Sequence, residues 1–237
     1  LTEAAGLDMR FTQQHAKAPL LAMVTSTTPP DYFFIGDDSA DLHFDPQRLP
    51  AGWMDEARVL HFGCISLTRE PLASRLLQIA QEAALRNKKI AFDPNWRKLM
   101  DSPSYRILLQ QLLSLSHYVK VSDEDLERLF PGDGNALATL QALAPQAEIL
   151  YTLGAKGMQW IKGEQVIEQP AYRVEVVDTV GCGDASMGGW IASQLRQPDA
   201  PAQVHLQCAA AGAAIAASKA GAYAATWDEV QAMIAAA

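Results

Sequence analysis

The stretch Val177–Ser186, which reads VDTVGCGDAS, decides the fold class more than any other part of this chain. Two glycines flank Cys182 in a run of small residues that joins the strand-like residues Val174–Val177 to a segment with helical spacing. Glycines allow successive backbone N–H groups to point into one concavity, and the following helix adds the positive end of its dipole. The stretch therefore predicts an anion site, suited to a phosphoryl group, between a strand and a helix.

Asp184 lies at the mouth of this predicted anion site. A carboxylate there repels phosphate, so its useful role is to accept a proton from a hydroxyl group that attacks phosphorus. On spacing alone, a loop with an N-cap aspartate before a helix accounts for the same residues. The stretch is not a Walker A loop, because no Lys-Ser/Thr pair follows its last glycine, and no G-x-G-x-x-G fingerprint of a dinucleotide-binding fold follows a strand.

The middle of the chain alternates between short apolar runs and longer segments with helical spacing. We predict strands over 59–65, 89–92, 118–121 and 149–153, and helices over 71–88 and 105–115. This order is typical of right-handed βαβ units, and so of an α/β fold with a mostly parallel central sheet flanked by helices. Ligands of such sheets bind beyond the carboxyl ends of the strands, where residues 93–97, 120–122 and 152–157 lie.

The two ends of the chain differ from the middle. Residues 20–26 and 32–35 are typical of strands, and the turn predicted at 27–30 would join them into a small β-ribbon. Three helices are predicted in the last third, at roughly 184–196, 201–218 and 227–236. Because neither an internal repeat nor a long Pro/Gly/Ser linker is present, we expect residues 1–237 to form one domain.

The composition excludes several classes of protein. The 237 residues are 49% hydrophobic and 19% charged, as in an ordinary globular protein. The net charge of −8 and the lack of a Lys/Arg-rich run argue against broad binding of nucleic acid or membrane surfaces. Cys64, Cys182 and Cys208 form no C-x-x-C pair, which disfavours a disulfide framework or a zinc site and favours a reducing cytoplasm. The sequence predicts neither a membrane span nor a signal peptide.

The stretch Asp178–Asp184 resembles the D-T-x-G-A-G-D signature of ribokinase-like carbohydrate kinases, also called the phosphofructokinase-B family. Cys182 replaces the usual alanine, which is a small-for-small change. Four other segments resemble family motifs in the family's order: Phe92–Arg97 (D-x-N-x-R), Lys120–Asp125 (N-x-x-E), Thr152–Gly157 (T-L-G-x-x-G) and Gly221-Ala222 (Gly-Ala near the adenine). The resemblance covers essentially the whole chain and implies a ribokinase-like fold with a small β lid, its strands within about 18–40.

The resemblance implies catalytic roles for the glycine-rich stretch. Asp184 would be the base on the sugar hydroxyl. Backbone donors to the transferring phosphoryl group would come from Gly181, Cys182 and Gly183. Asp178 and Val180 would help to hold a monovalent cation, usually potassium, which tightens this loop.

The resemblance also implies a nucleotide site and a magnesium ion. The nucleotide site would comprise Lys120, Ser122, Thr152, Leu153, Gly154, Ala155, Lys156, Gly157 and Gly221. Asn95 and Arg97 would lie near the phosphates or the sugar. Mg²⁺ would arrive with ATP, held largely by water and phosphate oxygens. Ser122 stands where the family's N-x-x-E motif has asparagine and Asp125 where it has glutamate, so Asp125, or Glu124 in its place, would face magnesium-bound water.

One part of the family pattern has no counterpart here. Family members usually open with a strand that carries a substrate aspartate, followed by a Gly-Gly-x-x-x-Asn segment. Residues Ala5–Asp8 instead resemble a G-V-D stretch that normally lies further along the chain. We therefore expect the complete protein to have a further N-terminal segment, which would hold most of the groups that contact the sugar.

Two further expectations concern Cys182 and the N-terminal ribbon. An electropositive turn would lower the pKa of the Cys182 thiol, so that alkylation there would inactivate the enzyme. The apolar residues Tyr32–Ile35 would leave an unpaired ribbon edge. In the family that the chain resembles, such strands form a lid over the sugar and often pair between subunits, so we expect a homodimer.

Together these features predict an ATP-dependent kinase that phosphorylates a primary hydroxyl group of a small sugar. Segments 30–41 and 60–63 are most similar to those of fructokinases, which favours fructose over ribose, 2-keto-3-deoxygluconate or a nucleoside. A non-catalytic regulator that binds sugar or nucleotide is the alternative from another class. Asp184 disfavours it, because a pure binder gains nothing from a carboxylate that faces phosphate. A Rossmann-type oxidoreductase lacks its glycine fingerprint.

Overall fold

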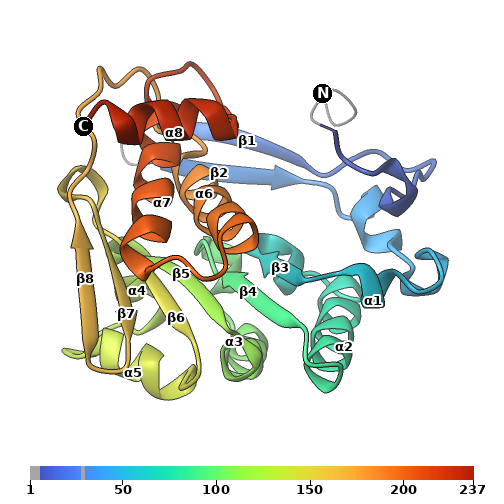
Figure 1. Cartoon of the computed structure of the whole chain (residues 1–237). Helices are drawn as coiled ribbons and strands as arrows, with labels where there is room; N and C mark the ends of the chain where they lie inside the picture. The colour runs from blue at the N-terminus through green and yellow to red at the C-terminus, as the bar shows by residue number, and fades with distance from the viewer. Residues whose placement is uncertain (1–5, 28–29) are drawn as a thin grey trace. The chain divides into compact units, whose positions relative to one another are not determined.

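The computed structural model describes residues 6–27 and 30–237 (Figure 1). The chain divides into two compact units. Unit 1 is built from the residues up to Ile90 and from Trp96–Leu115, and unit 2 from Ala91–Asn95 and Ser116–Ala237. The chain thus passes from one unit to the other within a strand, and the predicted single domain stays a prediction.

The first two strands of unit 1 form a two-stranded antiparallel sheet, which confirms the predicted ribbon. Its strands are β1 (Leu21–Thr27) and β2 (Pro30–Ile35). The predicted turn between them includes Thr28 and Pro29, which lie outside the described residues, as does Ala5 of the G-V-D-like segment.

One face of this ribbon is apolar. The register places Leu21 opposite Ile35 and Met23 opposite Phe33, and all four side chains are exposed. Side chains alternate between the two faces of a strand, so these four share one face.

The rest of unit 1 follows the predicted order of strand and helix. Its longer elements are β3 (Val59–Gly63), α2 (Leu72–Leu85) and α3 (Pro103–Leu115). Its short turns of helix are α1 (Trp53–Glu56), η1 (Met9–Phe11), η2 (Ala40–His43), η3 (Pro46–Arg48), η4 (Cys64–Thr68) and η5 (Lys98–Met100). The strand expected to reach residue 65 ends at Gly63, because Cys64 adopts a φ of 59° and begins a 3₁₀ turn.

The central sheet has six strands in the order β3-β4-β5-β6-β7-β8. The strands beyond β3 are β4 (Lys89–Asp93), β5 (Tyr118–Ser122), β6 (Glu148–Thr152), β7 (Met158–Lys162) and β8 (Gln165–Gln169). The pairings of β4 with β5 and of β5 with β6 are parallel, whereas β6, β7 and β8 form an antiparallel meander. The α/β fold with a mostly parallel sheet is confirmed, although β7 and β8 were not predicted.

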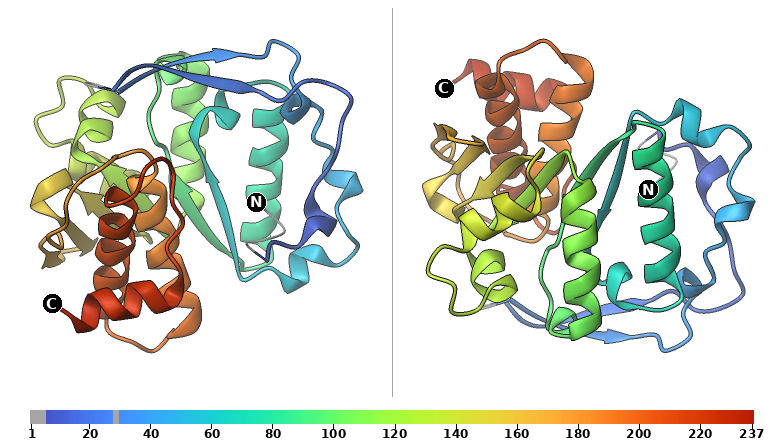
Figure 2. Two further views of the ribbon diagram at one scale, coloured as in Figure 1. Left: turned by 90° about the horizontal axis from the view of Figure 1, so that it is seen from above. Right: turned by 90° about the horizontal axis from the view of Figure 1, so that it is seen from below.

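Helices cover both faces of the sheet in unit 2. They are α4 (Asp123–Leu129), α5 (Ala136–Leu143), α6 (Cys182–Arg196), α7 (Ala202–Ala217) and α8 (Trp227–Ala235). Figures 1 and 2 show α6 and α7 on one face of β5–β8, and α4 and α5 on the other. The three predicted C-terminal helices are thereby confirmed, and none of the helices in the described part of the chain has the length and hydropathy of a membrane span.

The strand predicted over 174–177 is wrong. This segment forms no regular secondary structure, and its Val176 and Val177 side chains are exposed. The N–H groups of Val177 and Asp178 both donate to the carbonyl oxygen of Ala217, at 2.8 and 3.2 Å. The segment therefore follows the C-terminal end of α7 instead of joining the sheet.

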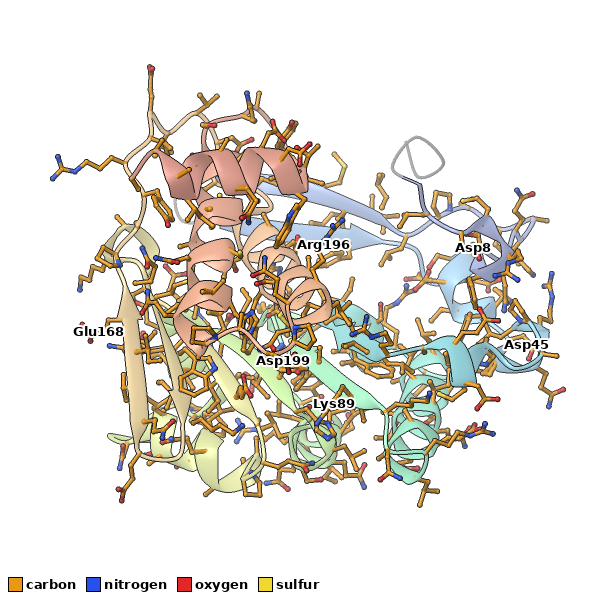
Figure 3. All side chains as sticks on the ribbon, in the orientation of Figure 1. Asp8, Asp45, Lys89, Glu168, Arg196 and Asp199 are labelled. Atoms are coloured by element: carbon orange, nitrogen blue, oxygen red, sulfur yellow. The ribbon has the colours of Figure 1, made fainter. Side chains whose placement is uncertain are left out.

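Small residues bring α6 and α7 close together. A Cβ on Gly189 would lie 2.6 Å from the carbonyl oxygen of Cys208, and a Cβ on Gly212 would lie 2.8 Å from that of Ala185. At the other end of α6, the guanidinium carbon of Arg196, labelled in Figure 3, lies 5.0 Å from the ring centre of Trp227. The position of α6 is thus fixed by close backbone contact along its length and by a cation–π contact with α8.

Adjacent glycines in α6 allow a matched test of this packing. We expect Gly189→Ala to destabilise the fold by about 1–3 kcal/mol, because the new methyl group overlaps a backbone atom that cannot move alone. Gly188→Ala, one residue earlier, meets nothing within 4 Å and should be neutral or stabilising by up to about 1 kcal/mol. Urea denaturation measures both changes, and equal effects would contradict the close-contact explanation.

A buried histidine makes the stability of unit 2 depend on pH. His205 on α7 is buried, and its Nδ1 lies 2.8 Å from Ser193 Oγ. Burial lowers the pKa of His205 below its ordinary value of 6.5. The unfolded chain therefore binds this proton more readily, so the free energy of unfolding falls as pH drops below about 6.5 and is restored as pH rises. We expect His205→Gln to remove this contribution, seen as a smaller difference between urea denaturation at pH 5 and pH 8.

Candidate functional site

The glycine-rich stretch forms the predicted turn into a helix. Gly181 is the N-cap of α6, with a φ of 80° that favours glycine, and a Cβ there would lie 3.2 Å from Ala222. The N–H of Ala185 donates to the carbonyl oxygen of Gly181 at 2.8 Å, which closes the first helical turn. The N–H groups of a first turn have no partner within the helix, although that of Cys182 donates to the carbonyl oxygen of Thr179 at 3.3 Å. An anion placed here meets the remaining N–H groups of the turn and the positive end of the dipole.

Asp184 presents its carboxylate beside this turn. It is the third residue of α6 and is exposed. Within the described ranges, 6–27 and 30–237, its side chain makes no hydrogen bond to the protein. A pocket of about 270 Å³ adjoins it, lined also by Gly181, Gly212 and Ala222. The carboxylate is therefore accessible from the pocket, and its role as a base stays a prediction.

A larger pocket lies in unit 1. Its volume is about 330 Å³, and its lining includes Gln13, His15, His43 and Arg48. None of the residues predicted to form the site lines it. We therefore place the candidate site at the turn into α6 and not at the larger pocket.

Asp178 joins the turn to the segment that follows α7. Its Oδ1 accepts a hydrogen bond from the N–H of Val180 at 3.0 Å, and its Oδ2 accepts one from the N–H of Gly221 at 2.9 Å. These two backbone donors lower the pKa of Asp178 below its ordinary value, so it stays ionised. The structure thus joins Asp178 and Val180, which were expected at a monovalent cation, to Gly221, which was expected at the nucleotide.

The predicted nucleotide loop, residues Thr152–Gly157, is a tight connection between β6 and β7. The N–H of Leu153 donates to the carbonyl oxygen of Gly157 at 2.9 Å, and the N–H of Gly157 donates to that of Gly154 at 3.0 Å. The tip of the loop, Gly154–Lys156, is a 3₁₀ turn (η6) and is exposed. The loop follows the carboxyl end of β6, where a ligand of this sheet would bind.

Ser122 and Asp125 form a capping box at the start of α4. Ser122 Oγ accepts a hydrogen bond from the N–H of Asp125 at 3.0 Å, and the Ser122 N–H and Oγ–H both donate to Asp125 Oδ2. One carboxylate oxygen of Asp125 is therefore occupied by the cap. The role of Asp125 near magnesium stays a prediction.

An ion pair beneath the turn was not foreseen. Lys120 Nζ donates to Asp93 Oδ2 at 2.9 Å, and both side chains are 4% exposed. A Cβ on Gly183 would lie 3.2 Å from the same Nζ. The available signal was that opposite charges stand at the ends of two successive predicted strands.

Asn95 and Arg97 follow β4. Asn95 belongs to unit 2 and has a φ of 45°, which is uncommon for a residue other than glycine. Arg97 belongs to unit 1, and its Nη1 donates to the carbonyl oxygen of Trp96 at 2.7 Å. Their contacts with phosphate or sugar stay predictions.

The expectation of a low pKa for Cys182 is wrong. Burial raises the pKa of the Cys182 thiol, and the nearby charge of Asp178 raises it further. The sulfur also lies 3.9 Å from the carbonyl oxygen of Asp178. The side chain thus faces negative groups, whereas the positive end of the helix acts through its N–H groups.

The fold and the site together define an α/β protein with a glycine-rich turn into a helix and an exposed carboxylate beside that turn. A family model described as "pfkB family carbohydrate kinase" matches residues 1–229. The chain belongs to this family.

Relatives and solved structures agree with this assignment. The chain is 34% identical over 142 residues to a fructokinase of Rhizobium leguminosarum bv. trifolii; the aligned residues cover 59% of this chain and 43% of that protein. It is 31% identical over 228 residues to the probable fructokinase-4 of Arabidopsis thaliana, covering 90% and 70%. The crystal structure of a fructokinase with bound ATP from Xylella fastidiosa has a TM-score of 0.88 at 25% identity, covering 99% of this chain and 79% of that one.

A kinase with another acceptor is also similar. Aminoimidazole riboside kinase from Salmonella enterica has a TM-score of 0.83 at 25% identity, covering 98% of this chain and 79% of that one. These likenesses confirm the ribokinase-like fold. The chain spans less than half of the Rhizobium fructokinase and of fructokinase-2 of Zea mays, at 43% and 48% of their lengths.

Proposed function

We propose that the complete protein is an ATP-dependent sugar kinase that transfers the γ-phosphoryl group to a primary hydroxyl group, with fructose as the favoured substrate. The observation that carries this proposal is the exposed carboxylate of Asp184 beside the amide-lined turn at Gly181–Gly183. A proton acceptor next to an anion site is what phosphoryl transfer to an alcohol needs.

In the proposed reaction, Asp184 accepts the proton of the sugar hydroxyl group while the hydroxyl oxygen forms a bond to the γ-phosphorus. The bond between that phosphorus and the β–γ bridging oxygen breaks, and ADP leaves with the electron pair. The N–H groups of Gly181 and Gly183 stabilise the charge on the transferring group, whereas the N–H of Cys182 donates to the carbonyl oxygen of Thr179 at 3.3 Å in the structure. Because these donors belong to a fixed turn, they need little rearrangement during the reaction.

The proposed nucleotide site combines the exposed loop tip Gly154–Lys156 with Ser122 and Gly221. The Xylella fructokinase was solved with bound ATP, which supports a nucleotide site in this fold. No group of three or more His, Cys, Asp or Glu side chains among the described residues could hold a metal ion. This fits a magnesium ion that is bound mainly by ATP phosphates and water, with Asp125 facing one of those waters.

Mg²⁺ bound in this way would neutralise charge on the phosphates. For potassium, we propose the segment that contains Asp178 and Val180. Both oxygens of the Asp178 carboxylate already accept backbone hydrogen bonds, which hold that segment in shape.

The names of the relatives support fructose as the acceptor. A nucleoside remains the second candidate, because the Salmonella protein is an aminoimidazole riboside kinase that was solved with aminoimidazole riboside and an ATP analog. Ribose and 2-keto-3-deoxygluconate are further alternatives.

We also propose that the β1–β2 ribbon is a lid and that it pairs with a second copy of the chain. Its apolar face, formed by Leu21, Met23, Phe33 and Ile35, supports this pairing. A homodimer is the species expected in sedimentation at micromolar concentration. Cys64, Cys182 and Cys208 are thiols and not disulfides in the described part of the chain, which is consistent with the proposed cytoplasmic location.

The experiment that tests the function is ATP consumption by the full-length protein against fructose, ribose, 2-keto-3-deoxygluconate and a nucleoside. We expect fructose to stimulate ADP formation most strongly. Binding of sugar or ATP without any turnover would favour the non-catalytic regulator. A nucleoside as the best acceptor would overturn the fructose assignment alone.

A further inference from the structure

Lys120 is a buried cation directly beneath the turn into α6. Its Nζ donates to Asp93 Oδ2 at 2.9 Å, and each of the two side chains is only 4% exposed. A Cβ on Gly183 would lie 3.2 Å from Nζ and 3.4 Å from Cε. The ammonium group therefore packs against the backbone of Gly183, in the turn that precedes the exposed Asp184.

This placement is unfavourable for an isolated helix. The N-terminus of a helix is its positive end and repels a cation, and removing an ammonium group from water adds a further cost. Burial alone would lower the pKa of Lys120. The charge and hydrogen bond of Asp93, together with smaller contributions from the charges of Asp125 and Asp184, outweigh burial and raise this pKa above its ordinary value. Lys120 thus remains protonated because three carboxylates offset the cost.

A second positive group beside a positive helix end is useful when a strongly negative group must be held there. Arrangements that are unfavourable for stability, such as a buried cation beside a positive helix end, are expected mainly at functional sites. A buried charge also acts at lower effective dielectric than a solvated one, so it has more influence on a neighbouring phosphoryl group.

We propose that Lys120, held in place by Asp93, is a positioning residue for phosphoryl transfer, whose ammonium group strengthens the positive field of the Gly181–Gly183 turn on the migrating phosphoryl group. The inference rests on the proposed function and deepens it. With 4% of its side chain exposed, Lys120 acts through the turn and not by touching the nucleotide.

This role predicts which ligands change in affinity when Lys120 is substituted. The field acts at the position of the transferred group, so it affects ATP in the transition state more than ADP. The test therefore compares ADP alone with ADP, Mg²⁺ and aluminium fluoride, in which the fluoride complex imitates the migrating group. This comparison does not require the sugar to be known.

The variant must remove both charges together. Lys120→Met alone removes the cation that neutralises the buried Asp93 carboxylate, which destabilises the fold. Lys120→Met combined with Asp93→Asn avoids this, and a cooperative unfolding curve shows that the variant is folded. The matched control is Lys162→Met, which breaks the exposed pair of Lys162 Nζ and Glu148 Oε1, 3.1 Å apart, on β7 of the same unit.

We expect the combined variant to bind ADP within about threefold of the unaltered protein but the fluoride complex about 100-fold more weakly, with kcat lowered by a similar factor and KM for the sugar little changed. Lys120→Arg, which keeps the charge, should retain more of the affinity for the fluoride complex and more of kcat. Lys162→Met should change none of these values.

Three outcomes overturn the proposal. Unchanged kcat and unchanged fluoride-complex affinity in the combined variant would show that the ion pair is only structural. Equal weakening of ADP and of the fluoride complex would place Lys120 in the nucleotide site. If the unaltered full-length protein neither phosphorylates a sugar nor binds the fluoride complex, the proposed function fails and this inference fails with it.

Discussion

Asp184→Asn should nearly abolish sugar phosphorylation while leaving the fold intact. We expect kcat to fall by about 10²–10⁴-fold, because the amide cannot accept the proton of the attacking hydroxyl group. The side chain is exposed and, in the described part of the chain, makes no hydrogen bond that the substitution could break. Its neutral replacement also repels phosphate less, so KM for ATP should stay the same or fall. Steady-state kinetics with full-length protein measures both values.

Asp228→Asn is the matched control for this prediction. Asp228 is also an exposed carboxylate in the first turn of a helix, α8, and it does not border the pocket beside Asp184. Its substitution should leave kcat unchanged. If the Asp184 variant kept kcat within about threefold of the unaltered protein, Asp184 would not be the base.

Gly157→Ala should cause the largest loss of stability among single-methyl substitutions. A Cβ on Gly157 would lie 2.1 Å from the carbonyl oxygen of Gln169 and 2.8 Å from the backbone N of Ala171. Neither atom can move alone, because Gln169 pairs with Met158 in the β7–β8 ladder. The φ of 100° adds backbone strain of about 1–3 kcal/mol, and the overlap adds about 1–3 kcal/mol more.

Gly163→Ala in the β7–β8 turn is the comparison for Gly157→Ala. Gly163 has a φ of 58° but meets nothing within 4 Å, so only the left-handed backbone is penalised, by about 1–2 kcal/mol. Urea denaturation measures the loss of unfolding free energy in both variants, and the difference between the two losses gives the contribution of atomic overlap. Equal losses would mean that the loop moves aside at no cost.

Features that depend on neighbours in sequence were predicted well. Ser122 ends a strand and is followed by three acidic residues, which is sufficient to predict the cap of α4. The glycines on either side of Cys182 are sufficient to predict the turn into α6, because a left-handed N-cap favours glycine. These signals need no knowledge of distant segments.

Features that depend on distant partners were missed. Gln165–Gln169 is too polar to be recognised as a strand, and its strand conformation comes from pairing with β7. The residues before Val177 have high strand propensity, but the backbone partner of Val177 is Ala217, at the end of α7.

The ion pair of Asp93 and Lys120 was missed for a related reason. The parallel register aligns Phe92 with Val119, so the following residue of each strand, Asp93 and Lys120, carries one of the two charges. Composition and spacing do not reveal such a register. The turn into α6 could therefore be predicted from the sequence, whereas the ion pair packed against it could not.

The two hydrogen bonds of Asp178 have a consequence for protein engineering. The Asp178 carboxylate links the turn before α6 to Gly221, so these two segments hold each other in place although about forty residues separate them. A chimaera that takes only one of these two segments from another member of the family would lose the match between Asp178 and the backbone that it contacts. Transplanting residues 178–184 should therefore be accompanied by residues 217–222 from the same donor.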